Sequence, residues 1–418
     1  MPKSKYSEEE AVQKPAGELL HGELGWDLVY CYDEETLGKD GTLGRTSYEE
    51  VILERYLEPA LLELNEWLEE EEIPSIIATL KSTLATDSLL QTNEKKYAML
   101  RDGIPVERTR NDGSTYEERA VVFDFEHPER NYFLICEELI VKSAFYTRRC
   151  DIVGFVNGIP LMFVEFKRHD KDIRRAYEDN YSDYQTTIPQ IFYFNAFVIL
   201  SNGTESRIGT LGSAYEFFSE WKRLDESDEV GSIALPTMLR GVCSKKNFID
   251  LFENFILFDH FTSPAAKILA RNHQFLGVNK AVEAFKQRAI NNGKLGVFWH
   301  TQGSGKSYSM VFIARKIKRK SLANSPTFLV LTDRDELDTQ ISDTFQSCGC
   351  LGSASSKSYI ASSGVDLIRK LQGNPSFIFS LIHKFNNSDV KPIIPNHDII
   401  ILSDEAHRTN NTTKCCFR

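Results

Sequence analysis

Two carboxylates and a lysine stand within one short stretch of the chain, where they could act together on a phosphodiester. Asp151 opens the segment DIVGFV, and Glu165 and Lys167 close the segment LMFVEFK. Carboxylate oxygens are ligands that Mg²⁺ prefers, and a nearby lysine can stabilise charge that develops on phosphate. We therefore predict a Mg²⁺-dependent phosphodiesterase site, in which Asp151 and Glu165 hold the metal and Lys167 positions or activates water.

The residues between these groups predict how they are brought together. Asn157 and Gly158 favour a type I′ turn, so the segments 151–156 and 160–166 should pair as the strands of a hairpin. Side chains alternate along a strand, so Glu165 should share a face with the lysine two positions later. The alternative is a cross-strand surface pair. Such a pair is worth only about 0.2–1 kcal/mol and poorly explains charges that close the apolar run LMFV.

A glycine-rich segment, HTQGSGKS at 300–307, could bind phosphates. Gly303 and Gly305 allow tight backbone turns, so that main-chain N–H groups can surround the β- and γ-phosphates at a helix N-terminus. Lys306 would neutralise phosphate charge, and Ser307 would ligate Mg²⁺. The segment therefore predicts an ATP-binding loop.

The neighbours of this loop favour the same interpretation. The apolar residues 295–299 predict a strand before the loop, and a helix is expected after it. Thr301 and Ser304 complete the expected nucleotide-binding set. The strict GxxxxGK[ST] pattern has glycine where this chain has His300, a departure that helicase-type loops tolerate.

An acidic pair later in the chain supplies the expected partner of the loop. The apolar segment HDIIIL at 397–402 predicts a strand, and the sequence DEAH follows it from Asp404. This sequence resembles the Mg²⁺ and water-activating motif of superfamily 2 helicases. The resemblance implies that Asp404 holds Mg²⁺, that Glu405 orients and deprotonates the attacking water, and that His407 couples the site to a partner lobe. The alternative is an acidic loop after a buried strand.

The elements around these residues predict an α/β protein with two domains. Strands dominate from 132 to 200, with a helix near 171–187, and the polar segment 223–231 suits a linker. The later strands and helices alternate, which predicts a parallel sheet. Ser47 and Glu50 form a capping-box pattern for a helix to about residue 65. The other expected elements are a strand at 26–32, a helical region at 248–292, and strands at 327–331, 377–379 and 398–402.

The first of these regions resembles the PD-(D/E)XK nucleases. Cys150-Asp151 stands in place of Pro-Asp, and Glu165-Phe166-Lys167 forms the ExK element. A related nuclease subgroup carries Gln-xxx-Tyr on the following helix. Here Asn180 occupies the glutamine position and Tyr184 matches the tyrosine, and residues four apart lie on one helix face. The resemblance implies a supporting role for both residues, although Asn180 departs from the pattern.

Across residues 20–410 the chain resembles the restriction subunits of type I restriction–modification enzymes. Segments 24–27, 43–65 and 187–203 carry the likeness in the first region. In the second region, 331–340 and 379–385 resemble DNA-contacting helicase motifs, and 270–282 resembles the adenine-recognition stretch, with Gln274 as the reader of the base.

The resemblance implies a PD-(D/E)XK nuclease-like mixed-sheet domain at 1–235 and a first RecA-like parallel α/β lobe at 241–418. It also implies Mg²⁺ and ATP as cofactors. The expected partners are double-stranded DNA and the modification (methyltransferase) and specificity subunits, which would carry sequence recognition.

The bulk composition is compatible with this interpretation. A formal net charge of −11 over 418 residues does not argue against DNA, because binding needs only a local basic surface. Eight cysteines lack the spacing of a zinc site, so we expect free thiols. No apolar run approaches the roughly 20 residues of a membrane span, and the start carries no apolar signal core. We therefore expect a cytoplasmic protein without membrane association.

Two other interpretations concern the second region. After Arg408 the chain reads TNNTTKCCFR, which supplies neither the second lobe nor the helical assembly region that the resemblance implies. The chain could be a truncated product that binds DNA, ATP or partner subunits without translocating, or a stand-alone nuclease with a vestigial nucleotide lobe. We expect weak ATP binding without turnover at a motor's rate, because an arginine finger can be worth about 10³–10⁵ in rate.

Overall fold

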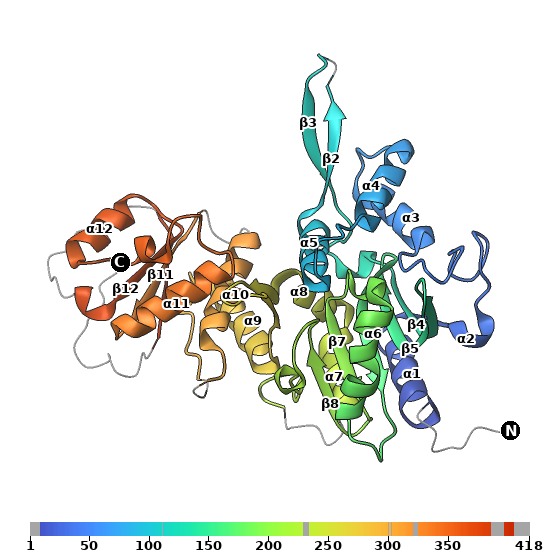
Figure 1. Cartoon of the computed structure of the whole chain (residues 1–418). Helices are drawn as coiled ribbons and strands as arrows, with labels where there is room; N and C mark the ends of the chain where they lie inside the picture. Colours follow the sequence, from blue (N-terminus) through green and yellow to red (C-terminus); the bar gives the residue numbers. More distant parts are fainter. Residues whose placement is uncertain are drawn as a thin grey trace. The chain divides into compact units, whose positions relative to one another are not determined.

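The computed structural model describes residues 9–110, 112–228, 234–299, 301, 303–320, 325–385 and 397–404 (Figure 1). The chain folds into two compact units. The first unit comprises Met1–Ile256 with Lys267–Asn272, and the second comprises Leu257–Ala266 with His273–Arg418. None of the helices in the described part of the chain combines the length and the apolar character that a bilayer crossing requires.

A mixed sheet organises the first unit. In its described residues, six strands lie in the order β1-β4-β5-β6-β7-β8. The β1–β4 and β6–β7 pairs are parallel, and the other neighbours are antiparallel. The mixed sheet predicted for this region is therefore confirmed. The strands are β1 (Asp27–Tyr30), β4 (Phe133–Lys142), β5 (Thr147–Val156), β6 (Ile159–Phe166), β7 (Phe197–Ser201) and β8 (Ser206–Gly209).

Helices pack around this sheet, and a separate hairpin extends from the unit (Figure 1). The hairpin of β2 (Ile104–Thr109) and β3 (Thr115–Ala120) projects away from it (Figure 1). A π-helical turn, Ala176–Tyr181, leads into α6. The helices of the first unit are α1 (Lys14–Gly22), α2 (Cys31–Glu34), α3 (Glu54–Leu64), α4 (Ile73–Lys81), α5 (Leu89–Asp102), α6 (Ser182–Thr187), α7 (Ala234–Cys243) and α8 (Lys245–Asn254).

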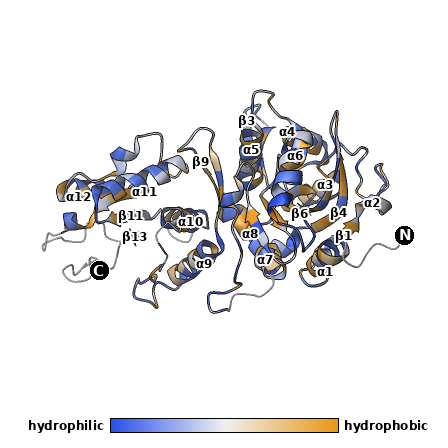
Figure 2. Ribbon diagram, turned by 60° about the horizontal axis from the view of Figure 1, so that its bottom comes forward, coloured by the Kyte–Doolittle hydropathy of each residue, from blue (hydrophilic) through white to orange (hydrophobic). Residues whose placement is uncertain are grey.

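The core of the first unit lies against the central strands. Every residue of β6 and β7 is buried. Figure 2 shows β6 largely in the hydrophobic colour, whereas α6 carries hydrophilic residues. Burial of one large apolar side chain stabilises a fold by about 1.5–3 kcal/mol. The apolar run before Glu165 therefore makes β6 a rigid support for the residues at its end.

The turn between β5 and β6 has the geometry that its sequence predicts. Asn157 has φ 46° and Gly158 has φ 78°, and a type I′ turn requires positive φ at both central residues. A Cβ atom on Gly158 would also lie 2.3 Å from the backbone oxygen of Leu53. Glycine is needed here for its conformation and for this close approach, and the predicted hairpin is confirmed.

The helix predicted from Ser47 begins later than expected, at Glu54. The Glu50 carboxylate accepts hydrogen bonds from the Thr46 amide and hydroxyl, both at 2.7 Å, instead of capping at Ser47. The Leu53 amide donates to the Gly158 carbonyl oxygen at 2.9 Å. Because these contacts hold the chain in an irregular path, the capping-box prediction is wrong.

A parallel sheet organises the second unit. In its described residues, β11 (Thr327–Thr332) lies between β12 (Phe377–Leu381) and β13 (Ile399–Ser403), and both pairings are parallel. The parallel sheet predicted for this region is confirmed. The longer helices are α9 (Asn272–Lys286), α10 (Lys306–Arg319), α11 (Asp335–Ser347) and α12 (Gly364–Gln372).

The helical region predicted over 248–292 is interrupted. Helix α8 ends at Asn254, and the strands β9 (Ile256–Asp259) and β10 (Ala266–Leu269) precede α9. The four residues of β9 are all buried, which suits a strand, and Pro264 lacks the amide hydrogen that a continuous helix would use. The prediction of one helical region is therefore wrong over 256–269.

The strand predicted over 295–299 is not formed among the described residues. The backbone there is irregular, and Gly296 has φ 119°, outside the extended region. Val297 is 84% exposed and Trp299 is 92% exposed, so the apolar run does not enter a core. Local hydrophobicity indicated a buried strand, but no strand pairing supports one.

Glu137 in β4 is a buried carboxylate whose pKa is raised, so the stability of the protein should depend on pH through this residue. Burial, and then the neighbouring Glu138, raise the pKa of Glu137 to about 7. Glu9 and Glu18 raise it further, and Lys14 opposes them. The pKa of Glu137 is higher in the folded protein than in the unfolded chain. Protonated Glu137 therefore contributes to the free energy of unfolding fully below the unfolded pKa, and this contribution is lost as pH rises through about 7.

We expect Glu137→Gln to stabilise the protein at pH 8, by on the order of 2–3 kcal/mol, with little effect near pH 5. The substitution retains the shape of the side chain and removes its titration. Urea denaturation of both proteins between pH 5 and 8 measures the difference. Parallel stability profiles for the two proteins would contradict the assignment of this titration to Glu137.

Candidate active sites

The predicted phosphodiesterase residues lie on neighbouring strands of the first unit. Asp151 is in β5, Glu165 is the penultimate residue of β6, and Lys167 follows the end of β6. The Asp151 Oδ2 atom accepts a hydrogen bond from the Phe166 amide at 2.7 Å, so this carboxylate is fixed between the other two positions. The Lys167 Nζ atom lies 3.9 Å from the Glu165 Oε1 atom.

Asn180 connects the lysine and the glutamate. The Lys167 Nζ atom donates to Asn180 Oδ1 at 2.9 Å, and the Asn180 Nδ2 atom donates to Glu165 Oε1. The Glu165 side chain is 1% exposed and that of Lys167 is 14% exposed, so water screens these contacts weakly. The Asn180 amide therefore fixes the orientation of Lys167 and Glu165. Asparagine thus makes these contacts at the position where the nuclease subgroup named above has glutamine.

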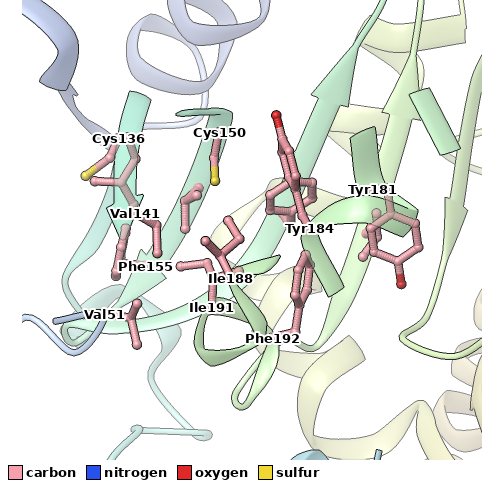
Figure 3. Close-up of a cluster of buried hydrophobic side chains, with 14 of the residues drawn as sticks. Val51, Cys136, Val141, Cys150, Phe155, Tyr181, Tyr184, Ile188, Ile191 and Phe192 are labelled. Atoms are coloured by element: carbon pink, nitrogen blue, oxygen red, sulfur yellow. The ribbon is translucent and has the colours of Figure 1, made fainter. Parts of the chain in front are cut away.

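Tyr184 supports the same group from α6. In Figure 3 its ring stands beside the buried side chains, and its hydroxyl points away from Ile188 and Ile191. The hydroxyl donates to the Arg149 carbonyl oxygen at 3.2 Å, and Asn180 Nδ2 lies 3.5 Å from it. Burial raises the pKa of Tyr184, so the phenol stays protonated and can donate. The helix residues predicted to assist the site thus contact it.

Three residues that support the site, Glu138, Arg149 and Gln13, were not predicted from the sequence. Glu138 has φ 57°, and it lies between two residues of β4 that pair with β5, Glu137 opposite Ile152 and Leu139 opposite Cys150. The Glu138 carboxylate forms an ion pair with Arg149.

The third supporting residue, Gln13, lies near the start of the chain. It is 2% exposed, and its Nε2 atom donates to the Asp151 carbonyl oxygen at 3.1 Å. The partners are separated by 138 positions in the sequence, so no local sequence signal marks this contact.

The donor set of this centre suits Mg²⁺ bound together with a phosphate. Among the residues that the structure describes, no group of three or more His, Cys, Asp or Glu side chains could hold a metal ion. Mg²⁺ usually takes only one or two protein carboxylates and completes its coordination with water and substrate phosphate. Asp151 and Glu165 are two oxygen-donor side chains on adjacent strands, and they fit that pattern.

The predicted phosphate loop forms a tight turn before α10 in the second unit. Gly303 has φ 76° and Gly305 has φ 84°, and Lys306 is the first residue of the helix. A Cβ atom on Gly305 would lie 2.8 Å from the Gln274 Nε2 atom. The left-handed backbone favours glycine at this position, and a side chain here would also displace the Gln274 amide.

Helix α9 holds this loop. The Gln274 Nε2 atom donates to the Gly305 carbonyl oxygen at 2.9 Å, and the His273 Nε2 atom lies 3.1 Å from the Ser304 carbonyl oxygen. Thr301 is exposed, and its carbonyl oxygen accepts from the Ser304 amide at 3.3 Å. The amide of Gln274 contacts the loop backbone, and its role as the reader of adenine stays a prediction.

A pocket of about 1050 Å³ brings the phosphate loop and the acidic motif together. It is lined by Gly303, Gly305, Lys306, Ser307 and Asp404, and by residues of α11. The Asp404 amide donates to the Leu331 carbonyl oxygen at 2.8 Å, which fixes this residue at the end of β13. The predicted residues Glu405, His407 and His300 lie outside the described residues.

The protein is therefore of the α/β class. Its first unit carries a carboxylate–lysine centre on a mixed sheet, and its second unit carries a glycine-rich loop next to a parallel sheet. Residues 5–217 match the family described as type I restriction enzyme R protein N terminus, and residues 273–415 match the family described as SWI2/SNF2 ATPase. The first match covers about half of the 418 residues. The chain belongs to the family of type I restriction enzyme R proteins.

Curated relatives carry the same description. The type I restriction enzyme HindI endonuclease subunit of Haemophilus influenzae is 32% identical over 406 residues, which cover 92% of this chain and 38% of that protein. A provisionally named MjaIXP endonuclease subunit of Methanocaldococcus jannaschii is 29% identical over 88% of this chain and 37% of its own length. A Staphylococcus aureus relative, SauMSSORF170P, is 25% identical over 74% of this chain. The chain spans well under half the length of these relatives.

Proposed function

We propose that this chain forms the nuclease and first motor region of a type I restriction subunit, and that it cleaves DNA phosphodiesters with Mg²⁺. The observation that carries the proposal is the contact of Lys167 and Glu165 through Asn180, beside an Asp151 carboxylate bound to the Phe166 amide. A surface ion pair would not need a buried glutamate, a bridging amide and a supporting tyrosine.

In this proposal each side chain has a separate task. Asp151 and Glu165 would hold Mg²⁺, which when bound supplies Lewis acidity toward the phosphate and lowers the pKa of water. Lys167 would face the phosphate as a fixed positive charge where negative charge develops. Asn180 orients both Lys167 and Glu165, and Tyr184 holds the β5 backbone at Arg149.

The proposal extends to the fold and to the second unit. We assign a PD-(D/E)XK-type nuclease domain to residues 1–235 and a RecA-like first lobe to 241–418. The second region would bind ATP with Mg²⁺ through Lys306, Ser307 and Asp404, which line one pocket. Glu405 would activate the attacking water.

The relatives' description as endonuclease subunits supports a wider assembly for this chain. The substrate would be double-stranded DNA, and translocation in the complete enzyme would use ATP. The modification and specificity subunits would be the partners.

Metal dependence tests the proposed cleavage. We expect the purified chain to nick supercoiled DNA with millimolar Mg²⁺, because the two carboxylates need a cation to act on phosphate. Activity should disappear with a chelator and return when Mg²⁺ is restored, as followed by the conversion of supercoiled to open-circular plasmid. Cleavage that survives complete metal removal would contradict the proposal.

A further inference from the structure

The hairpin between β4 and β5 presents aromatic side chains to solvent. Phe145 is 89% exposed and Tyr146 is 47% exposed. The turn is well formed, because the Ser143 amide donates to the Tyr146 carbonyl oxygen at 2.8 Å. A single exposed apolar residue needs no explanation, but here two lie together at the tip of a defined hairpin.

Arginines lie against the aromatic rings of this region. The Arg148 guanidinium is 5.2 Å from the Tyr146 ring centroid, and the Arg149 guanidinium is 4.6 Å from that of Tyr32. Tyr32 is 50% exposed, and the Arg149 side chain is 52% exposed. Stacked aromatic rings and guanidinium groups are the side chains that bind bases and phosphates in nucleic-acid complexes.

The hairpin is joined directly to the carboxylate–lysine centre. Arg149 lies two residues before Asp151, and its carbonyl oxygen accepts the Tyr184 hydroxyl. The Arg148 Nε atom also bonds to Asp183 on α6 at 2.7 Å, which fixes the base of the hairpin. Phe145 lies six positions before Asp151, so at about 3.3 Å per residue the tip lies within about 20 Å of Asp151.

A basic loop follows the same centre on the other strand. Residues 167–175, KRHDKDIRR, contain five lysines and arginines and two aspartates. In this loop Arg168, Lys171, Arg174 and Arg175 are exposed, and Arg168 and Arg174 form exposed ion pairs with Asp170 and Glu178, which water screens. The 418 residues together carry a formal net charge of −11, so the positive charge of this loop contrasts with the acidic composition of the chain. An acidic ligand complements a surface of this kind.

We propose that the hairpin 143–149 and the loop 167–175 form a surface that holds double-stranded DNA across Asp151, Glu165 and Lys167. The arginines and the loop contact phosphates on either side of the scissile bond. Phe145 contacts an opened or bent base step, as apolar wedges do in proteins that deform DNA. This inference rests on the proposed nuclease function and specifies how its substrate is held.

Fluorescence anisotropy with labelled 25-base-pair duplexes tests the surface. The 418-residue chain is used with Asp151→Asn, which is expected to suppress cleavage during the titration. We expect Phe145→Ala to weaken binding about tenfold, and Phe145→Trp to retain it, because stacking of an aromatic ring on a base is worth about 1–3 kcal/mol. Phe217 is also highly exposed, at 63%, and Phe217→Ala is the matched control that should bind normally.

The loop gives a second readout. Each phosphate contact contributes about 0.9 to the slope of log affinity against log salt. Arg168→Ala with Arg175→Ala should therefore lower that slope by about 2, whereas Lys95→Ala with Arg119→Ala, which removes two exposed charges elsewhere, should not.

The outcomes separate this inference from the proposed function. Unchanged affinity in Phe145→Ala together with an unchanged salt slope in the loop variant would overturn the surface, even if the wild-type chain cleaves DNA. Binding that depends on Phe145 and on the loop, in a chain that shows no metal-dependent cleavage, would support the surface and contradict the nuclease proposal. A duplex with a central mismatch should bind more tightly than a matched one only when Phe145 is present, since an unpaired step opens at lower cost.

Discussion

Asp151→Asn and Lys167→Ala are each expected to lower Mg²⁺-dependent DNA cleavage by about 10²–10³-fold or more, which is the range for removing one preorganised charge-stabilising group. Asparagine keeps an oxygen that can accept from the Phe166 amide, so the strand pairing should survive while the negative charge is lost. Alanine at 167 removes the ammonium group and leaves Asn180 bound to Glu165. Initial rates of plasmid nicking measure both effects.

The controls for these variants come from the same unit. Lys95 is 51% exposed and pairs with Asp87, so Lys95→Ala removes a lysine without touching the centre. It should cleave at the wild-type rate. Thermal unfolding should show that Asp151→Asn and Lys167→Ala remain folded. Full cleavage by either folded variant would mean that the activity belongs to another site.

The local parts of the centre could be predicted because their information lies within a few residues. The Asn157-Gly158 pair specified the turn, since both residues tolerate positive φ. Glu165 and Lys167 are two residues apart, and Asn180 and Tyr184 are four apart, so strand and helix periods predict that each pair lies on one side. The contacts form as predicted, although Lys167 follows the end of β6 and Asn180 lies in a π-helical turn.

The supporting contacts could not be predicted because they join distant segments. Gln13 reaches the backbone of Asp151 across 138 residues, and no pattern in either segment marks the pair. The positive φ of Glu138 has no residue signature either, since neither glycine nor asparagine stands there.

Two failed predictions share a different cause, which is tertiary context that overrides a local pattern. The apolar residues 295–299 matched a buried strand, yet Val297 and Trp299 are exposed. Ser47 matched a helix cap, yet Glu50 bonds to Thr46 and the helix begins seven residues later, at Glu54. Short patterns of this kind indicate only a local preference, and packing against neighbouring segments decides whether the element forms.

Lys306→Ala is expected to weaken ATP binding by about 10–100-fold, because a hydrogen bond to a charged group contributes about 1.5–3 kcal/mol. Lys306 begins α10 and lines the same pocket as Ser307 and Asp404, so its ammonium group can meet the β- and γ-phosphates. The backbone amides of the loop remain, and they should retain a residual affinity. Equilibrium titration with a fluorescent ATP analogue and Mg²⁺ measures the loss.

Lys318→Ala is the matched control, since Lys318 lies on the same helix, is exposed, and stacks over Phe377 at 5.1 Å. It should bind ATP as the wild type does, and both variants should unfold at similar temperatures. Asp404→Asn should weaken binding with Mg²⁺ more than without it, because this carboxylate is proposed to act through the metal. Equal affinity in Lys306→Ala and Lys318→Ala would show that the pocket binds nucleotide without this lysine or does not bind it. Titration of the wild-type chain distinguishes these explanations. Saturable binding of the ATP analogue would mean that the pocket binds nucleotide without Lys306, and the absence of saturation would mean that it does not bind nucleotide.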